Sequence, residues 1–292
     1  MKDKIIIKDK KRNYFFQDIC DKYNVQEMYG LRTDKKLYSK LSKKGIYILG
    51  KWKRDIEKYD EVILFESLYN ERVAKYIKRK NPNCRLILFF WNTIMDKTRK
   101  KYLKDEYIDE FWTFDPKDAE KYGINLNSQF YTKTIKLNEK PKEIDVLFLG
   151  RNKGRKEFLL DLESKLNAKG INTNIMITEN TKDFVCFNEY LENIEKSKVI
   201  LDIVIEGQAG LTLRCMESLF FKRKLITNNK EVMKYEFYNP NNIFILEKDN
   251  FEKINEFINS KYEDIDSKIV DYYDIENWLK RFDKKEGLEY GK

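Results

Sequence analysis

Histidine is absent from the 292-residue sequence, and cysteine and proline occur only four times each. The cysteines are spread through the chain at Cys20, Cys84, Cys186 and Cys215 and form no CxxC pair, so the usual ligands of zinc are missing or scattered. The low proline count and the 11 glycines also exclude collagen-like and low-complexity chains. We therefore expect a globular protein with reduced thiols and no metal or other cofactor.

Long apolar segments are lacking as well. The longest, Leu86–Trp91, is far shorter than the ~20 residues that span a bilayer, and the chain is charged from Lys2 onward without an apolar stretch of signal-peptide length. These features predict a cytoplasmic protein with no membrane-spanning helix. With 41% hydrophobic residues, a chain of this length has enough apolar side chains for two domains of ordinary size.

Charge is distributed unevenly along the chain. Residues 1–140 contain 33 basic and 21 acidic residues, whereas residues 141–292 contain 25 and 28. A basic first half predicts an anionic partner, and nucleic acid, an anionic membrane surface or a lipid-phosphate acceptor would each fit. A general enrichment in lysine would produce the same excess without any partner, and the sequence leaves these alternatives open.

Strand-like and helix-like segments alternate in both halves. Continuous apolar runs bounded by turns, such as 84–91 and 144–150, are typical of parallel strands that are covered on both faces. A polar segment at 140–142, with a proline between two lysines, separates two such series. We therefore predict an α/β fold of two Rossmann-like, doubly wound parallel-sheet domains, 1–140 and 141–292, that face a cleft. The closing helical region is expected to pack back on the first domain.

The expected elements alternate in chain order. Strands are expected at 5–7, 45–50, 60–66, 84–91, 108–114, 144–150, 171–177, 199–203, 224–227 and 242–246. Helices are expected at 13–23, 71–79, from 116 onward, at 157–168, 188–196 and 211–220, and around 272–278. Asn70 is the expected N-cap of the second helix, and Asp115–Pro116 is expected to begin the third.

A basic loop follows the strand expected at 144–150 and leads directly into a helix. It contains four cations and two glycines in the sequence GRNKGRK. Ligands of open α/β sheets bind outside the carboxyl ends of the strands, and a helix N-terminus favours an anion. The loop therefore predicts diphosphate binding, although a solvated basic turn would have the same composition. The residues predicted to bind are Gly150, Arg151, Arg155 and Lys156.

A second loop, Glu206–Gly210, contains two glycines and precedes the last long helix. Glycines allow a ligand to approach the backbone closely, and the amides of a first helical turn are free to donate. Arg214 and Glu217 are three residues apart and share a helix face; they predict contacts to phosphate and ribose, unless they form an intrahelical ion pair. The diphosphate-binding residues predicted here are Gly210, Leu211, Thr212 and Arg214.

Two segments resemble the donor domain of GT-B glycosyltransferases. Residues 145–159 (DVLFLGRNKGRKEFL) resemble the strand, loop and helix that open that domain, and Arg151 and Lys156 match its two diphosphate-binding cations. Residues 197–229 (SKVILDIVIEGQAGLTLRCMESLFFKRKLITNN) resemble the loop and helix of the bacterial surface-polysaccharide and spore-maturation-like branch, and Glu217 matches the ribose-binding Glu. The resemblance covers residues 144–246 and is only architectural in the first half.

The resemblance implies a glycosyltransferase, with hexose transfer expected, that moves a sugar from a nucleotide-sugar to a saccharide or lipid-linked acceptor in bacterial surface glycan synthesis. It would work at the inner face of the cell membrane in peripheral contact with anionic lipid. Cations and helix dipoles, rather than a metal, would stabilise the leaving diphosphate. The Glu-x7-Glu motif common in the family is not intact, and Glu206 and Gln208 are the residues expected at the donor sugar.

A catalytic base is harder to assign. Without histidine, an inverting enzyme would need a carboxylate to deprotonate the acceptor hydroxyl. Glu66, at the expected carboxyl end of a strand, is the first candidate and Asp34 is the second. Either carboxylate could instead be structural or solvated, and a retaining enzyme would need no such base.

Other interpretations are also compatible with parts of the sequence. A nucleic-acid-binding protein fits the net charge of +9 and the 14% aromatic residues, but basic residues alternate with acids and no RNP-type or helix-turn-helix pattern occurs, so no nucleic acid partner is expected. A dehydrogenase lacks support because no GxGxxG follows an expected strand. A non-catalytic homologue that binds a nucleotide-sugar would have the same sequence features as the enzyme.

Overall fold

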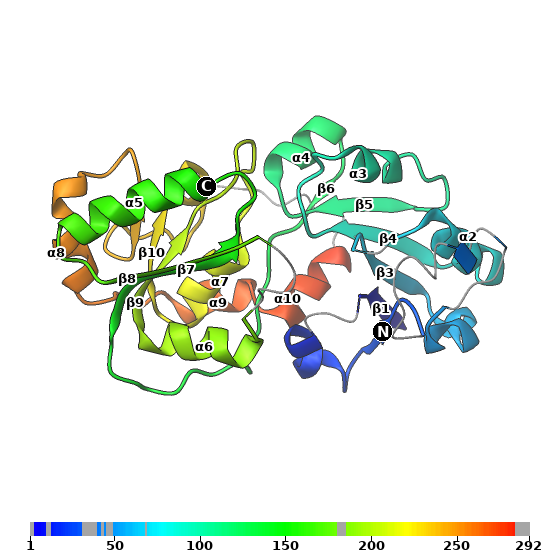
Figure 1. Cartoon of the computed structure of the whole chain (residues 1–292). Coiled ribbons are helices and arrows are strands. Elements are labelled where there is room, and N and C mark those ends of the chain that lie inside the picture. Colours follow the sequence, from blue (N-terminus) through cyan, green and yellow to red (C-terminus); the bar gives the residue numbers. More distant parts are fainter. Residues whose placement is uncertain are drawn as a thin grey trace. The chain divides into compact units, whose positions relative to one another are not determined.

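The computed structural model describes residues 3–9, 13–30, 40–41, 44, 49–67, 69–179 and 185–283. The chain forms two compact units, of which one runs to Ser128 and includes the segment that begins at Leu279, and the other is Gln129–Trp278. Each unit contains one sheet of parallel strands, as Figure 1 shows. The expected α/β class with two parallel sheets of Rossmann-like topology is confirmed.

The boundary between the two units lies between Ser128 and Gln129. The sequence predicts this boundary at residues 140/141. Local packing accounts for the difference. The aromatic rings of Phe130 and Trp278 lie 4.3 Å apart between centroids, and Tyr131 forms a parallel bridge with Asp274. The segment after Ser128 is therefore held by the end of the second unit.

The sheet of the first unit has six strands in the order β2-β1-β3-β4-β5-β6. Their bounds are β1 Lys4–Lys8, β2 Asn24–Glu27, β3 Glu61–Phe65, β4 Arg85–Phe90, β5 Glu110–Thr113 and β6 Asn125–Leu126. The neighbouring strands pair in parallel. Both β1 and β3 are buried along their whole length, as expected of strands covered on both faces.

One expectation in the first unit needs correction, and another lies mostly outside the described residues. The helix expected at 13–23 is a short 3-10 helix, Asn13–Ile19, and is followed by β2. The sequence of β2, NVQE, contains one apolar residue because the strand lies at the edge of the sheet and is only half-buried. Most of the strand expected at 45–50 lies outside the described residues.

The helices of the first unit include α2 (Glu71–Lys80), α3 (Lys97–Tyr102) and α4 (Pro116–Tyr122). The Asn70 side chain accepts from the Arg72 amide, and Asp115 caps α4, so both helix starts are confirmed. The expected closing helix around 272–278 belongs to the second unit, and its packing on the first stays a prediction. The segment that begins at Leu279 belongs to the first unit, where Phe282 is fully buried against Trp112 with ring centroids 4.8 Å apart.

The sheet of the second unit has five strands in the order β11-β10-β9-β7-β8. The strands are β7 Ile144–Arg151, β8 Thr173–Thr178, β9 Ser197–Asp202, β10 Lys224–Thr227 and β11 Ile243–Ile245. The helices are α5 Lys156–Ala168, α6 Phe187–Lys196, α7 Leu213–Phe220, α8 Ile254–Asn259, α9 Ser267–Tyr272 and α10 Ile275–Lys280, the last of which crosses into the first unit.

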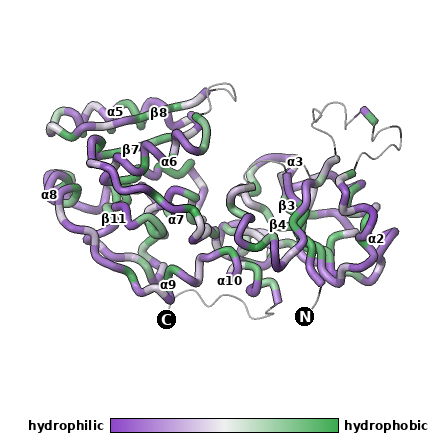
Figure 2. The backbone as a smooth tube through the Cα atoms, turned by 90° about the horizontal axis from the view of Figure 1, so that it is seen from below, coloured by the Kyte–Doolittle hydropathy of each residue, from purple (hydrophilic) through white to green (hydrophobic). Residues whose placement is uncertain are grey.

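Helices cover both faces of this second sheet. On one face, α5 buries Leu159, Leu162 and Leu166 at helical spacing against Val146 and Phe148 of β7. In Figure 1, α6 lies on the other face, and hydrophilic and hydrophobic segments alternate along α5 in Figure 2. The carboxyl ends of the strands are therefore left to loops, and these loops hold the predicted site.

Candidate functional site

The two predicted loops meet at a point where the strand order of the second sheet reverses. The chain passes from β7 to β8 on one side and then returns to β9 on the other side of β7. The loop after β7 and the loop after β9 thus start from neighbouring carboxyl ends. This is the place where ligands bind in open α/β sheets.

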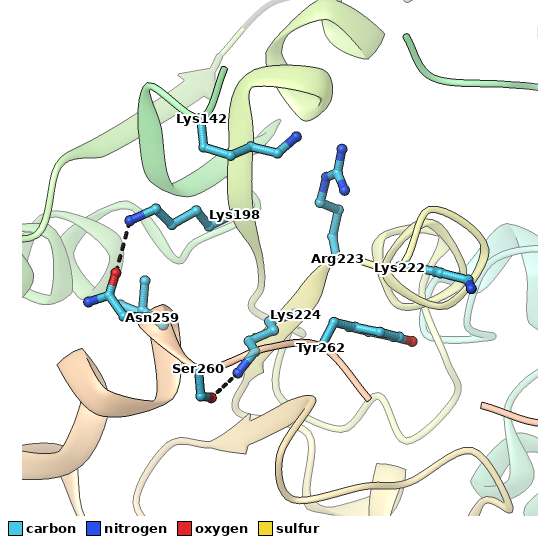
Figure 3. A pocket seen from close by; sticks show the side chains of 9 residues that line it. Lys142, Lys198, Lys222, Arg223, Lys224, Asn259, Ser260 and Tyr262 are labelled. Carbon is cyan, nitrogen blue, oxygen red and sulfur yellow. Dashed lines mark hydrogen bonds between the residues drawn. The ribbon is translucent and has the colours of Figure 1, made fainter. Parts of the chain in front are cut away.

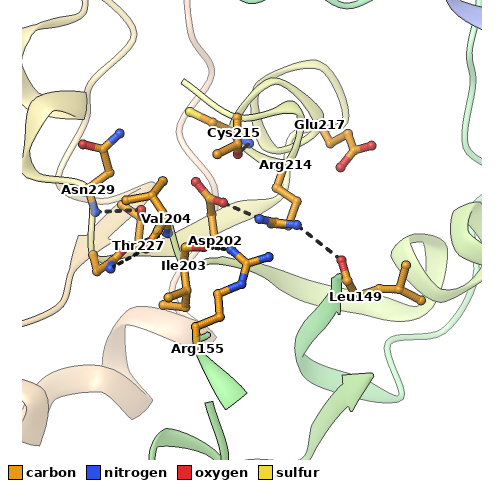
Figure 4. Close-up of polar contacts among 12 residues, drawn as sticks. Leu149, Arg155, Asp202, Ile203, Val204, Arg214, Cys215, Glu217, Thr227 and Asn229 are labelled. Atoms are coloured by element: carbon orange, nitrogen blue, oxygen red, sulfur yellow. Dashed lines mark hydrogen bonds and ion pairs between the residues drawn. The ribbon is translucent and has the colours of Figure 1, made fainter. Parts of the chain in front are cut away.

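Two arginines connect these strand ends. Arg155, at the start of α5, donates to the backbone carbonyls of Ile203 and Arg151. Arg214, in the first turn of α7, donates through Nη1 to the carbonyl of Leu149 at 3.3 Å. Figure 4 shows Arg214 reaching from the helix toward the end of β7. The sequence predicted that both side chains bind diphosphate; the structure brings them together.

Both guanidinium groups also contact the same aromatic ring. Arg155 and Arg214 each lie 5.1 Å from the ring centroid of Phe148, within the range of a cation–π interaction. A Cβ atom at Gly150 would lie 3.1 Å from Arg214 Nη1 and 3.2 Å from Arg155 Nη2. The glycine therefore provides the room that the two guanidinium groups need.

A single carboxylate is in salt-bridge contact with this arginine pair in the described part of the chain. Arg214 Nε lies 3.0 Å from Oδ1 of Asp202, which is buried at the end of β9. Burial, together with the neighbouring charge of Arg214, lowers the pKa of Arg155 to about 10, and Asp202 opposes this shift. Arg155 remains protonated at neutral pH, and two guanidinium groups beside one carboxylate leave an excess of positive charge that a bound anion would offset.

Further cations border the cluster. Arg151 and Lys156 are exposed, and Lys156 lies 3.5 Å from Glu179. The loop between them turns through two left-handed residues, Lys153 (φ 46°) and Gly154 (φ 82°), of which only glycine adopts this conformation without strain. At the start of α5 the Lys156 amide donates to the Asn152 side chain at 3.0 Å, while the side chain of the N-cap Arg155 accepts no amide of the first turn. The other amides of this turn suit an anion.

The intrahelical ion pair considered for Arg214 and Glu217 is not formed. Arg214 pairs with Asp202, while Glu217 is buried and accepts from the hydroxyl of Tyr190 at 2.5 Å. In Figure 4 the Glu217 side chain leaves α7 in a different direction from Arg214. Thr212 caps α7 through the Cys215 amide at 3.2 Å, and its hydroxyl proton can still be donated to a ligand.

Two asparagines after β10 hold the glycine loop in place. Asn228 accepts from the Val204 amide at 2.8 Å, and Asn229 donates to the carbonyl of Ala209 at 3.1 Å. Gly207 adopts a φ of 85° within this loop, near the exposed Glu206 and the half-buried Gln208. Gly210 and Leu211 are buried. The roles predicted for Glu206 and Gln208 at a donor sugar stay predictions.

Sequence reasoning missed four side chains of this arrangement. Asp202 is a polar residue at the end of an apolar run, and Asn228 and Asn229 are a pair of asparagines after a strand. Phe148 gives no signal, because an aromatic residue within a buried strand is expected in any case. The missed side chains are Phe148, Asp202, Asn228 and Asn229.

The candidate base Glu66 lies in the first unit, directly after β3. Its carboxylate is buried and accepts from the Trp91 amide at 2.9 Å, the Asn92 side chain at 2.5 Å and Arg99 Nε at 3.2 Å. Burial raises its pKa despite these donors. The contacts show a carboxylate that positions the loop after β4. Asp34, the second candidate, lies outside the described residues.

No family model fits the sequence, and none of the curated proteins matches it. In the described segments, no group of three or more His, Cys, Asp or Glu side chains could hold a metal ion. None of the helices there is both long enough and apolar enough to cross a membrane.

Proposed function

We propose that the chain is a nucleotide-sugar-dependent glycosyltransferase of the GT-B type, with its donor site at the carboxyl edge of the β7–β11 sheet. The observation that carries the proposal is the pairing of Arg155 and Arg214 over Phe148 at the switch point. Two cations with one buried carboxylate between them provide an excess charge that the two phosphates of a nucleotide-sugar would neutralise.

The roles in this proposal follow from position. Arg214 and the cations of the first loop, Arg151 and Lys156, contact the diphosphate, and Arg155 fixes the loop while adding positive charge. Glu217 accepts from the ribose hydroxyls in addition to Tyr190, since a carboxylate has about four acceptor positions. As the bond to the sugar breaks, negative charge develops on the diphosphate, and fixed cations stabilise that charge.

The acceptor in this proposal is a saccharide or a lipid-linked glycan. The protein works in the cytoplasm against the anionic inner leaflet, and the excess of basic residues in the first half supports this placement. Hexose transfer in surface glycan synthesis is the activity proposed.

A transfer assay tests the proposal. The full chain is incubated with a panel of radiolabelled nucleotide-sugars and with lipid-linked acceptors extracted from bacterial membranes. The proposal expects a labelled glycolipid with one of the donors and a much lower rate for Arg214→Lys, which keeps the charge but loses the planar donor group. Binding of a nucleotide-sugar without transfer would indicate a non-catalytic homologue. Absence of both binding and transfer would reject the assignment.

A further inference from the structure

A second concentration of positive charge lies at the opposite edge of the β7–β11 sheet. A shallow pocket with a volume of about 200 Å³ is formed where the strands begin. Lys224 is the first residue of β10, Lys198 is the second residue of β9, and Lys142 precedes β7. The five basic side chains that line the pocket, all in the second unit, are Lys142, Lys198, Lys222, Arg223 and Lys224.

Two of the five cations are paired with carboxylates. Lys198 lies 2.7 Å from Asp145, and Lys222 lies 2.5 Å from Asp264. The other three, Lys142, Arg223 and Lys224, have no carboxylate within salt-bridge distance among the residues that the structure describes. The charges of Lys142 and Arg223 are therefore available to a ligand, whereas Lys224 is buried and donates to Phe257 and Ser260.

The three remaining cations use part of their hydrogen-bonding capacity on backbone carbonyls at helix ends. Lys142 donates to the Glu195 carbonyl, Lys224 to that of Phe257 at 2.6 Å, and Arg223 to that of Ile194 at 3.3 Å. These contacts hold the cations in place and offset the negative ends of the helix dipoles. A lysine has three donors and an arginine has five, so donors are left over for an anion.

Burial has the same effect on all three side chains. It lowers the pKa of Lys142, Arg223 and Lys224, and Arg223 lowers that of Lys142 further. The carboxylates that oppose these shifts are Glu139, Glu195 and Glu263. Glu195 is itself bound by Lys140 at 2.8 Å and by Asn138. Lys142 and Arg223 are partly desolvated and extend toward one another, so both gain from an anion that enters between them.

The lining also limits the size of the ligand. Tyr262 offers a hydroxyl that stays protonated because burial raises its pKa. A neighbouring hollow shares Ser260 and Tyr262 but is bordered by the carboxylates of Glu263 and Asp264. A long polyanion would be repelled there, whereas a compact anion would contact only the basic side. Figure 3 shows Lys142 and Arg223 extending toward one another at this side of the pocket.

We propose that this pocket binds a compact phosphoryl group through Lys142 and Arg223. The strands separate it from the predicted donor site by about 15 Å, as expected for five residues of extended chain. The phosphoryl group belongs either to a soluble phosphate compound or to the headgroup of an anionic phospholipid. This proposal stands independently of the glycosyltransferase activity.

Calorimetric titration of the full chain with inorganic phosphate and with pyrophosphate tests the soluble source. Sedimentation with vesicles of phosphatidic acid and phosphatidylcholine, against phosphatidylcholine alone, tests the lipid. Lys142→Gln and Arg223→Gln should each weaken binding about tenfold, the loss of one charged hydrogen bond. Lys165→Gln, on the exposed face of α5, should leave it unchanged.

Binding of soluble phosphate that the two pocket variants weaken would support a soluble ligand, and binding to phosphatidic acid vesicles alone would support a headgroup. No binding to either probe, or binding that both variants leave unchanged, overturns the proposal. Hydrogen exchange of the wild-type chain avoids any folding defect of the variants: phosphate or phosphatidic acid should protect the amides of 222–224 and 258–262. Equal exchange with and without both probes would also overturn it.

Discussion

Arg155 and Arg214 lie close together although like charges repel, and Asp202 and Phe148 make this arrangement tolerable. The carboxylate neutralises part of the charge, and the face of the ring offers negative electrostatic potential to both guanidinium groups. Burial first, and then the charge of Arg214, lower the pKa of Arg155 in spite of Asp202. A bound anion would offset the remaining positive charge, and the proposed function supplies one.

Glu66 gives a prediction about pH. Because burial raises its pKa above the ordinary value of 4.5, the folded state binds more protons than the unfolded state from about pH 4.5 upward. The free energy of unfolding contributed by this group therefore falls as the pH rises through that window. Urea unfolding of the wild type and of Glu66→Gln across pH 4.5–7 should show this slope in the wild type only. Parallel pH profiles for the two proteins would contradict the assigned burial.

Tyr190 gives a prediction about stability. Its hydroxyl donates to the buried carboxylate of Glu217, and burial keeps the phenol protonated by raising its pKa. Tyr190→Phe removes the donor without changing the shape of the side chain. The free energy of unfolding should fall by about 1–3 kcal/mol, the cost of a buried charged acceptor that loses a partner. Tyr238→Phe, on a half-buried tyrosine of the same unit, is the control and should change it far less.

At the scale of elements, the loop after β7 depends on Gly150. An added Cβ would lie 3.1 Å from Arg214 Nη1, so the guanidinium group must move by a few tenths of an ångström. We expect Gly150→Ala to lower nucleotide affinity about tenfold while the free energy of unfolding changes by less than about 1 kcal/mol, because the far end of a side chain can shift. Calorimetric titration and urea unfolding measure the two effects. Unchanged affinity would show that the position of Arg214 is not critical.

The sequence predicts elements well where apolar runs are continuous. The strands at 84–91 and 144–150 correspond to β4 and β7 within one or two residues, because burial on both faces requires an unbroken apolar run. The edge strand β2 was missed for the opposite reason. The meeting of the two loops follows from topology, whereas the contacts of Arg214 with Asp202 and Phe148 depend on distant packing that no local pattern encodes.

At the scale of the whole molecule, the chain returns to the first unit at its last described segment. Phe282 is fully buried, and its ring lies 6.1 Å from Phe89 and 4.8 Å from Trp112. Phe282→Ala should lower the free energy of unfolding of the first unit by about 3–5 kcal/mol through cavity formation. Urea unfolding followed by tryptophan fluorescence tests this. Leu160→Ala, at an exposed position of α5, should have little effect; an equally small effect of Phe282→Ala would contradict the observed packing.

The sheet of the second unit has two edges of different chemistry. The carboxyl edge combines loops, helix starts and paired arginines, and the amino edge carries the pocket with Lys142 and Arg223, which have no salt-bridge partner in the described residues. Nucleotide and phosphoryl ligands are thus expected at separate places, and variants of one edge should not affect the other.

Thermal stabilisation by nucleotides tests the central claim most directly. The wild type, Arg151→Gln/Lys156→Gln and the control Lys165→Gln, whose altered residue lies on the same helix as Lys156, are compared with UDP, GDP, CMP and dTDP, and with NAD and a short oligonucleotide. We predict selective stabilisation of the wild type and the control by one nucleotide, reduced in the double variant. Stabilisation by the oligonucleotide alone, or equal responses of all three proteins, would contradict a donor site at the carboxyl edge of β7 and β9.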